Sequence, residues 1–307
     1  MFFQNPKLKG QNSFFSFLAT LAVVILFYLI SSLPLMLYSL QQGWSQSDLG
    51  RYHGPVSFAL MLFVFSGILF GVMFATRRIH RRAVITVFTG ASSFRWRHMF
   101  GGALVWLIVM ILLEVVGFLT EPEVYTFQLD PLPFLACLLV GILILPLQTT
   151  AEEVMIRGYL MQQIGLLVPY RWIPVLVTSV FFGLLHTQNP EVLQFGLYKA
   201  MILYIGMGLF LGLITAMDDG LEIPMGVHYV NNLFSLLFVG YKGSVFEGTP
   251  TIFLKEAEDL TYTSVISNLV VMGIVLFILK FIFRWEKFSR LFKNTDSSLN
   301  ESISKNF

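Results

Sequence analysis

Three ionisable residues lie close together in a part of the chain that is otherwise apolar. Glu152, Glu153 and Arg157 end a hydrophobic run that begins near Pro133. An ionisable side chain at membrane depth costs about 2.5 to 3.5 kcal/mol even on a lenient scale, so such residues usually serve a function and face the protein interior. A carboxylate placed there can act as a general base. These three residues are therefore the first candidates for chemistry.

Helical spacing separates the two glutamates. Residues four apart share a helix face, so Glu153 can pair with Arg157, with the acid N-terminal to the base. One residue along a helix is a rotation of about 100°, so Glu152 points to a different neighbour. The spacing predicts one carboxylate that is held by an arginine and one that is available for reaction.

Two further segments carry polar residues at helical spacing. His186 follows Phe182 by four residues, and His228 precedes Asn232 by four. Histidine can exchange protons near neutral pH, and an asparagine amide can donate a hydrogen bond to a developing negative charge. A carboxylate, two imidazoles and an amide together suit hydrolysis of a peptide bond inside the membrane.

The elements that must position these residues are transmembrane helices. The 307 residues are 56% hydrophobic and only 12% charged, which excludes an ordinary soluble domain. The predicted fold is all-α, a polytopic membrane protein with a bundle of about eight transmembrane helices, the fifth and seventh being short. Segments of spanning length run over residues 14–38, 56–76, 100–119, 134–160, 172–185, 195–216, 223–240 and 265–283.

Basic residues predict the orientation of these spans. By the positive-inside rule the loops that they fill are cytoplasmic, which places both termini inside. The loop with Asp218 and Asp219 lacks the expected basic residues. The first apolar run is longer than a signal peptide allows and is expected to remain as a span. The basic residues are Lys7, Lys9, Arg77, Arg78, Arg81, Arg82, Arg95, Arg97, Arg171, Arg284, Lys287, Arg290 and Lys293.

The chain divides into four parts. Residues 1–132 hold three helices and their loops, and 133–240 hold the catalytic core helices. Residues 241–293 form an extracytoplasmic loop and the last helix, and 294–307 form a polar tail with too little apolar surface to order itself. Within the spans, Glu114 is expected to accept an interhelical hydrogen bond, and Gly208 and Gly212 have the small-xxx-small spacing of closely packed helices.

Three motifs in this order resemble those of a known family. Glu152 to Arg157 matches EExxxR, Phe182 to His186 matches FxxxH, and His228 to Asn232 matches HxxxN. Together they resemble the CAAX prenyl protease and bacteriocin-processing (CPBP, or Abi) family of intramembrane proteases, whose eukaryotic members trim prenylated CAAX proteins. The resemblance covers roughly residues 134–240. One departure is Ile156, where the family often has an aromatic residue.

The resemblance implies an intramembrane endopeptidase. The resemblance further implies that Glu152 is the general base that activates water and that His186 assists it. It implies that His228 and Asn232 donate hydrogen bonds to the oxyanion. Glu153 and Arg157 hold the glutamate helix in register, with Phe182 as a supporting residue. The implied substrate is a peptide or protein tail presented at the bilayer, and lipidated substrates are implied by the family alone.

Three alternatives stay open. Glu152, His186 and His228 could hold zinc with an open fourth position, although HExxH is absent, and the resemblance favours a glutamate mechanism without a cofactor. A non-proteolytic immunity or scaffold protein would use the same residues to brace the bundle. A transporter would use them as a proton relay, but no paired repeat is found.

The sequence also predicts the setting of the protein. It is expected to be a multi-pass protein of a prokaryotic cell membrane rather than of the endoplasmic reticulum. The expected partners are the lipid bilayer and a membrane-associated substrate. The net charge of +2 indicates no nucleic-acid surface.

Overall fold

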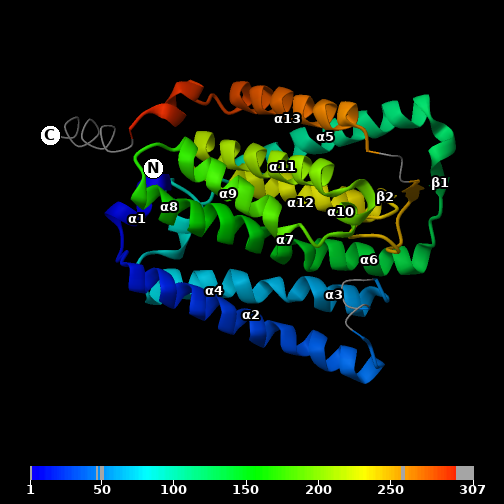
Figure 1. Cartoon of the computed structure of the whole chain (residues 1–307), viewed down its shortest axis with the longest axis horizontal. Coiled ribbons are helices and arrows are strands. Elements are labelled where there is room, and N and C mark those ends of the chain that lie inside the picture. The colour runs from blue at the N-terminus through cyan, green and yellow to red at the C-terminus, as the bar shows by residue number, and fades with distance from the viewer. Residues whose placement is uncertain (1, 46–47, 49–51, 257–259, 295–307) are drawn as a thin grey trace.

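The fold is a bundle of helices that lie side by side along one axis (Figure 1). The computed structural model describes residues 2–45, 48, 52–256 and 260–294. In this part of the chain six helices are long and apolar enough to cross a membrane: Phe14–Gln42, Pro55–Arg78, Trp96–Thr120, Pro131–Leu167, Leu197–Asp218 and Tyr262–Ile282. Trp172–Leu185 and Glu222–Leu237 are shorter. The prediction of a polytopic helical membrane protein is confirmed, including the two short helices.

Two of these spans are built from more than one element. The second comprises α3 (Pro55–Phe63) and α4 (Phe65–Arg78), and the fourth comprises α6 (Pro131–Leu143), α7 (Leu145–Glu153), a π-helical segment (Val154–Leu160) and α8 (Met161–Leu167). The others are α2 (Phe14–Gln42), α5 (Trp96–Thr120), α9 (Trp172–Leu185), α11 (Leu197–Asp218), α12 (Glu222–Leu237) and α13 (Tyr262–Ile282). Short helices are α1 (Asn5–Leu8), α10 (Pro190–Phe195) and the 3₁₀ turns Phe2–Gln4, Val84–Val87, Pro122–Val124 and Phe288–Phe292.

The fourth span changes its helical pitch where the two glutamates lie. Glu153 is the last residue of α7, and the π-helical segment begins at Val154. Such wider turns occur mostly as short insertions in α-helices, frequently at functional sites. Gly158 lies inside this segment against the backbone of Val87, where a Cβ would be 2.6 Å from the carbonyl oxygen. The segment therefore packs closely against the loop after α4.

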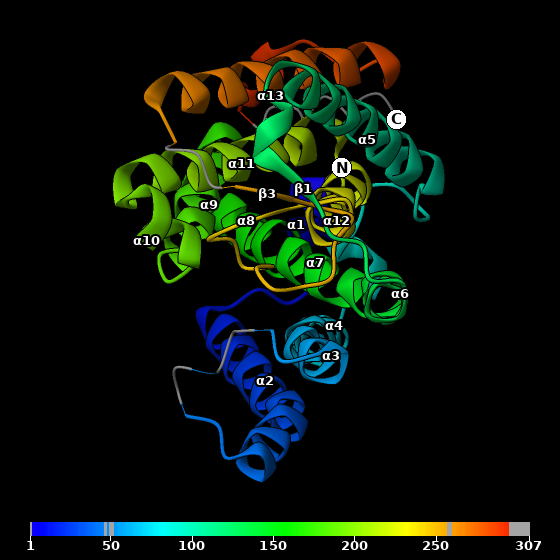
Figure 2. The ribbon, with the colours of Figure 1, turned by 90° about the vertical axis from the view of Figure 1, so that its right-hand side faces the viewer.

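Glycines set the spacing between neighbouring helices. Seen along the bundle axis, α2 forms one edge, α4 lies between α2 and the fourth span, and α5 and α13 form the opposite edge (Figure 2). A Cβ at Gly208 of α11 would lie 2.8 Å from the carbonyl oxygen of Ser179 in α9, and one at Gly212 would lie 3.2 Å from Val175. The close packing predicted from the spacing of Gly208 and Gly212 is confirmed.

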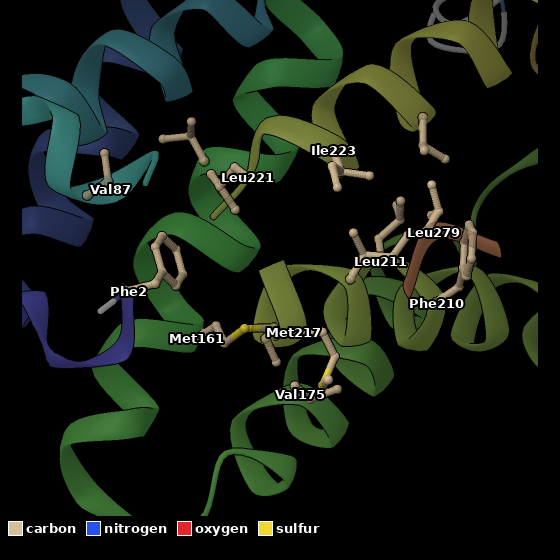
Figure 3. Packing of buried hydrophobic residues seen from close by; sticks show 14 of the residues in the cluster. Phe2, Val87, Met161, Val175, Phe210, Leu211, Met217, Leu221, Ile223 and Leu279 are labelled. Carbon is tan, nitrogen blue, oxygen red and sulfur yellow. The ribbon is translucent and has the colours of Figure 1, made fainter. Parts of the chain in front are cut away.

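The buried apolar core joins both ends of the chain. Phe2, Val87 and Leu221 pack near Met161 and Met217, while Leu279 of the last span meets Leu211 and Phe210 (Figure 3). Phe2 and Leu279 have no exposed surface. Many large apolar side chains of α2, α5 and α13 are exposed instead, as expected for helices that face lipid.

A small sheet caps one end of the bundle, which the all-α prediction does not include. β1 (Tyr125–Phe127) pairs antiparallel with β3 (Phe253–Lys255), which pairs parallel with β2 (Val239–Tyr241). Glu114 of α5 accepts hydrogen bonds from the hydroxyl groups of Tyr125, at 2.7 Å, and Tyr241. Glu114 is thus hydrogen-bonded as predicted, but its partners come from strands and not from another helix.

The opposite end of the bundle gathers the basic loops around one acidic turn. Asp218 accepts from Arg95 at 2.8 Å, and Asp219 pairs with Arg171 at 3.2 Å and Arg290 at 2.6 Å. The turn that lacks basic residues of its own therefore takes them from three other segments. Helix α1 and the turn Phe288–Phe292 lie at this same end (Figure 1). The polar tail beyond Asn294 lies outside the described residues.

Candidate active site

The candidate site lies between α7, α9, α11 and α12. Glu152 and Glu153 come from the end of α7, while His228 and Asn232 lie one turn apart on α12. Helix α12 packs against α7 on one side and α5 on another. This packing brings together motifs that are more than 70 residues apart in the sequence.

Glu153 is the buried centre of the polar cluster. Its Oε1 accepts from Arg157 Nη1 at 2.8 Å and from His228 Nδ1 at 2.8 Å. Neither Glu153 nor Arg157 has exposed surface. The guanidinium also lies over the ring of Phe182, 4.3 Å from its centroid, and donates to the carbonyl of Gly208 at 3.3 Å. The predicted pair of Glu153 and Arg157 is present, and it holds the imidazole of His228 as well.

The bond to Glu153 determines the protonation pattern of His228. A carboxylate can only accept, so Nδ1 of His228 carries a proton. The second nitrogen, Nε2, lies 3.7 Å from Oε2 of Glu152. His228 therefore stands between the two adjacent glutamates, with one nitrogen directed to each.

One oxygen of Glu152 is hydrogen-bonded and the other is not, as is also the case for Glu153. The Oε1 of Glu152 accepts from Nε2 of Gln148, one turn earlier on α7. Its Oε2 is buried and has no hydrogen-bond partner among the described residues. The side chain as a whole is 17% exposed. Glu152 thus combines an unpartnered oxygen with a partly exposed side chain, whereas Glu153 is fully buried.

Asn232 joins the cluster through Gln148. Its Nδ2 donates to Oε1 of Gln148 at 3.4 Å, and its Oδ1 accepts from Nδ2 of Asn231 at 3.2 Å. An amide nitrogen carries two protons, so Asn232 keeps a second N–H beyond this bond.

His186 borders the cluster through aromatic contacts. It follows the last residue of α9, and its Nδ1 lies 2.7 Å from the carbonyl oxygen of Phe182, to which it donates. Its ring centroid is 4.4 Å from that of Phe182 and 4.5 Å from that of Tyr204, on which it stacks. Phe182 in turn meets His228 edge-on at 6.2 Å. Within the described ranges no hydrogen bond joins His186 to Glu152.

Two residues of the site escaped the sequence analysis. Gln148 had a readable signal, because it lies four residues before Glu152 in an apolar run. Tyr204 had none, since the apolar runs are rich in aromatic residues. Its hydroxyl accepts from Asn189 at 3.0 Å while its ring supports His186.

The residues that could hold zinc are not arranged as a ligand set. In the part of the chain that the structure describes, no three His, Cys, Asp or Glu side chains come together in a way that could hold a metal ion. Glu152 and His228 are neighbours, but Phe182 lies between the rings of His186 and His228 and contacts both. We therefore assign no step of peptide-bond hydrolysis to a metal.

An apolar cavity of about 340 Å³ lies apart from these residues. It is lined by α5, the end of α12 and the sheet, and Glu114 and Tyr125 are among its lining residues. It lies where α12 meets α5, whereas the polar cluster lies where α12 meets α7. The cavity is thus not part of the candidate site.

Comparison with known proteins shows that the three motifs lie within a segment that matches a known protein family. The family described as "Type II CAAX prenyl endopeptidase Rce1-like" matches residues 131–234, which include every residue of the three motifs. The "Uncharacterized protein YyaK" of Bacillus subtilis (strain 168) is 32% identical over 210 residues, which are 67% of this chain and 70% of that protein. No solved structure matches the chain. The chain belongs to the Rce1-like CAAX protease family of membrane endopeptidases.

Proposed function

We propose that the protein is an intramembrane endopeptidase in which Glu152 activates water to hydrolyse a peptide bond. The bond lies near the C-terminal tail or in a membrane-presented segment of the substrate. The observation that carries this proposal is that Glu152, unlike the fully buried Glu153, is partly exposed and places an unpartnered Oε2 3.7 Å from His228 Nε2. A positioned base of this kind contributes roughly 10² to 10⁴ in rate.

The reaction begins when Glu152 takes a proton from water. The remaining hydroxide adds to the carbonyl carbon of the scissile bond, and the carbonyl oxygen becomes an oxyanion. Collapse of this intermediate breaks the C–N bond, and the proton held by Glu152 passes to the leaving amine. The products are a new carboxylic acid and a free amine, which become a carboxylate and an ammonium when the remaining water proton passes from the acid to the amine, and Glu152 returns to its charged form. His186 assists through Nε2, which its bond to the Phe182 carbonyl leaves unprotonated in the neutral ring.

His228 and Asn232 donate to the oxyanion. His228 already gives Nδ1–H to Glu153, so it donates through Nε2 only as an imidazolium. Asn232 supplies its second amide N–H. Removing one such donor typically costs roughly 10² to 10³ in rate.

A panel of membrane-anchored peptides tests the proposal. The purified protein in detergent is given prenylated and unprenylated peptides of the same sequence, and products are identified by mass spectrometry. Wild type is expected to cleave, whereas Glu152→Gln, His186→Ala and His228→Ala are expected to lose cleavage while remaining folded. Cleavage that persists in Glu152→Gln contradicts the assigned base. Absence of cleavage by wild type favours the immunity or scaffold function.

Treatment with a chelator tests the alternative mechanism, in which zinc is required. Activity of the glutamate enzyme is expected to survive EDTA at a concentration that strips zinc from a control metalloprotease. Loss of activity that added zinc restores would replace the glutamate mechanism with a metal-dependent one. Comparison of the two peptides, prenylated and unprenylated, then determines whether the lipid is required.

A further inference from the structure

We propose that Trp106, Asn231 and Gln148 are positioning residues, which form with Asn232 and Glu152 a hydrogen-bond chain that runs in one direction. The inference rests on the proposed function, because its consequence is the orientation of the base and of one oxyanion donor. None of these three is a defining residue of the motifs, although Asn231 occupies a variable position of HxxxN.

The chain has four links. Trp106 Nε1 donates to Asn231 Oδ1 at 3.2 Å, and Asn231 Nδ2 donates to Asn232 Oδ1 at 3.2 Å. Asn232 Nδ2 donates to Gln148 Oε1 at 3.4 Å, the longest link, and Gln148 Nε2 donates to Glu152 Oε1. Trp106 is 6% exposed and Gln148 is 8% exposed. The hydrogen-bond chain therefore crosses from α5 through α12 to α7, from the buried Trp106 to the partly exposed Glu152.

The two end groups fix the direction of every amide between them. An indole N–H can only donate, and an ionised carboxylate can only accept. Each amide in between accepts from one neighbour and donates to the next, and reversing one of them would place two donors or two acceptors face to face. Hydrogen bonds that point the same way also strengthen one another. Trp106 thus orients Asn232 without contacting it.

The consequence for the site concerns which atoms remain free. Because Gln148 occupies Oε1 of Glu152, the oxygen left without a partner is Oε2, which faces His228. Because Asn232 is held with Oδ1 toward Asn231, its amide nitrogen is the group at the site. A rotated Asn232 would present its oxygen to the oxyanion and repel it.

Two variants interrupt the chain at different points. Gln148→Met keeps the approximate shape and removes both polar contacts next to Glu152. Trp106→Phe keeps an aromatic ring and removes the donor at the far end. A hydrogen bond to a charged group contributes more than one between neutral groups. We therefore expect kcat to fall roughly 10- to 100-fold in Gln148→Met and roughly 3- to 10-fold in Trp106→Phe, with KM within about twofold of wild type.

Gln163→Met is the matched control. Gln163 lies in the same span, fifteen residues after Gln148, and is also buried, at 9% exposed. Its variant loses a buried amide of the same kind without touching the chain, and we expect wild-type kcat. Thermal unfolding of all variants in the same detergent identifies any that are simply misfolded.

A double-mutant cycle separates positioning from packing. If Trp106 acts through Asn232, then Trp106→Phe has no further effect on kcat in an Asn232→Ala background. Equal losses of kcat from Trp106→Phe in the wild-type and Asn232→Ala backgrounds would contradict the proposed hydrogen-bond chain. Wild-type kcat in Gln148→Met would contradict it as well. In either case cleavage by wild type and its loss in Glu152→Gln would leave the proposed function standing. Absence of cleavage by wild type would overturn both.

Discussion

The two adjacent glutamates share His228 but differ in burial and in their other contacts. Glu153 is fully buried and binds Arg157, whereas Glu152 is 17% exposed and accepts from Gln148. The rotation of about 100° between neighbouring helical residues produces this difference. The pair thus combines one carboxylate that is paired in the protein interior with one that is partly exposed.

This difference predicts that Glu153→Gln mainly lowers stability, whereas Glu152→Gln mainly lowers activity. Glu153→Gln leaves the buried guanidinium of Arg157 without its counter-charge, and losing one partner of a buried pair costs about 3 to 5 kcal/mol. Glu152→Gln keeps the hydrogen-bonding shape, so we expect its stability to lie within about 1 kcal/mol of wild type. Thermal unfolding in one detergent measures both variants. Equal unfolding temperatures for the two would contradict the assigned roles.

At this scale the sequence predicted what lies within one helix. Glu153 and Arg157 are four residues apart, so their pairing follows from helical geometry. The bond from His228 to Glu153 joins residues 75 positions apart, and it depends on how α12 packs against α7. The position of His186 beside Tyr204 depends in the same way on the packing of α9 against α11.

Helix α11 connects the packing of the bundle to the site. Gly208 lies against the backbone of Ser179 in α9, and its carbonyl accepts from Arg157. In contrast, Gly273 of α13 has open space where a Cβ would lie. The two glycines therefore differ in what a methyl group would meet.

Alanine substitutions are expected to separate these two glycines. Gly208→Ala forces α11 away from α9, and overpacking of this kind costs about 1 to 3 kcal/mol. Gly273→Ala removes a glycine from a helix interior and is expected to be neutral or to stabilise by up to about 1 kcal/mol. Thermal unfolding and peptide cleavage measure both variants. A stable and fully active Gly208→Ala would show that close packing there is not required.

The small sheet could not be predicted from the pattern of residues in the sequence. Each strand has three residues, and β3 pairs with two segments of which one is more than 120 residues away. Three residues are too few to show the alternation by which a strand is recognised. The long apolar helices, by contrast, follow from composition and length alone.

At the scale of the whole molecule, the basic loops and the acidic turn form one assembly. The turn with Asp218 and Asp219 carries no basic residues of its own, and its partners Arg95, Arg171 and Arg290 come from three other loops. Counting charges loop by loop could not predict this arrangement. It does explain why this turn can lie at the basic end of the bundle.

Labelling from the two sides of the membrane tests the predicted orientation. Lys293 lies at the end with the basic loops, and Glu121 lies near the sheet at the opposite end. With Cys137 replaced, Lys293→Cys is expected to react with an impermeant thiol reagent from the cytoplasmic side, and Glu121→Cys from the outer side. Labelling of both from the same side would contradict a spanning bundle, and exchanged sides would reverse the orientation.

His80 makes the stability of the basic end depend on pH. It is fully buried, and burial lowers the pKa of its imidazole below the ordinary value of 6.5. The unfolded chain therefore takes up this proton at a higher pH than the folded protein does. The contribution of His80 to the free energy of unfolding is constant above the pKa that this histidine has in the unfolded chain. The protein loses stability as the pH drops below about 6.5.

The corresponding variant should lose part of this acid sensitivity. Thermal unfolding between pH 7.5 and pH 5.5 is expected to show a smaller decrease in Tm for His80→Gln than for wild type. His53→Gln changes an exposed histidine and serves as the control. An unchanged pH dependence in His80→Gln would contradict the burial argument.

The initial rate of cleavage of one membrane-anchored peptide by wild type and by Glu152→Gln tests the central claim most directly. With both proteins folded to the same extent, we expect the rate to fall at least about 10²-fold in the variant, because the base that activates water is lost. A rate within twofold of wild type would show that Glu152 is not the base of this enzyme.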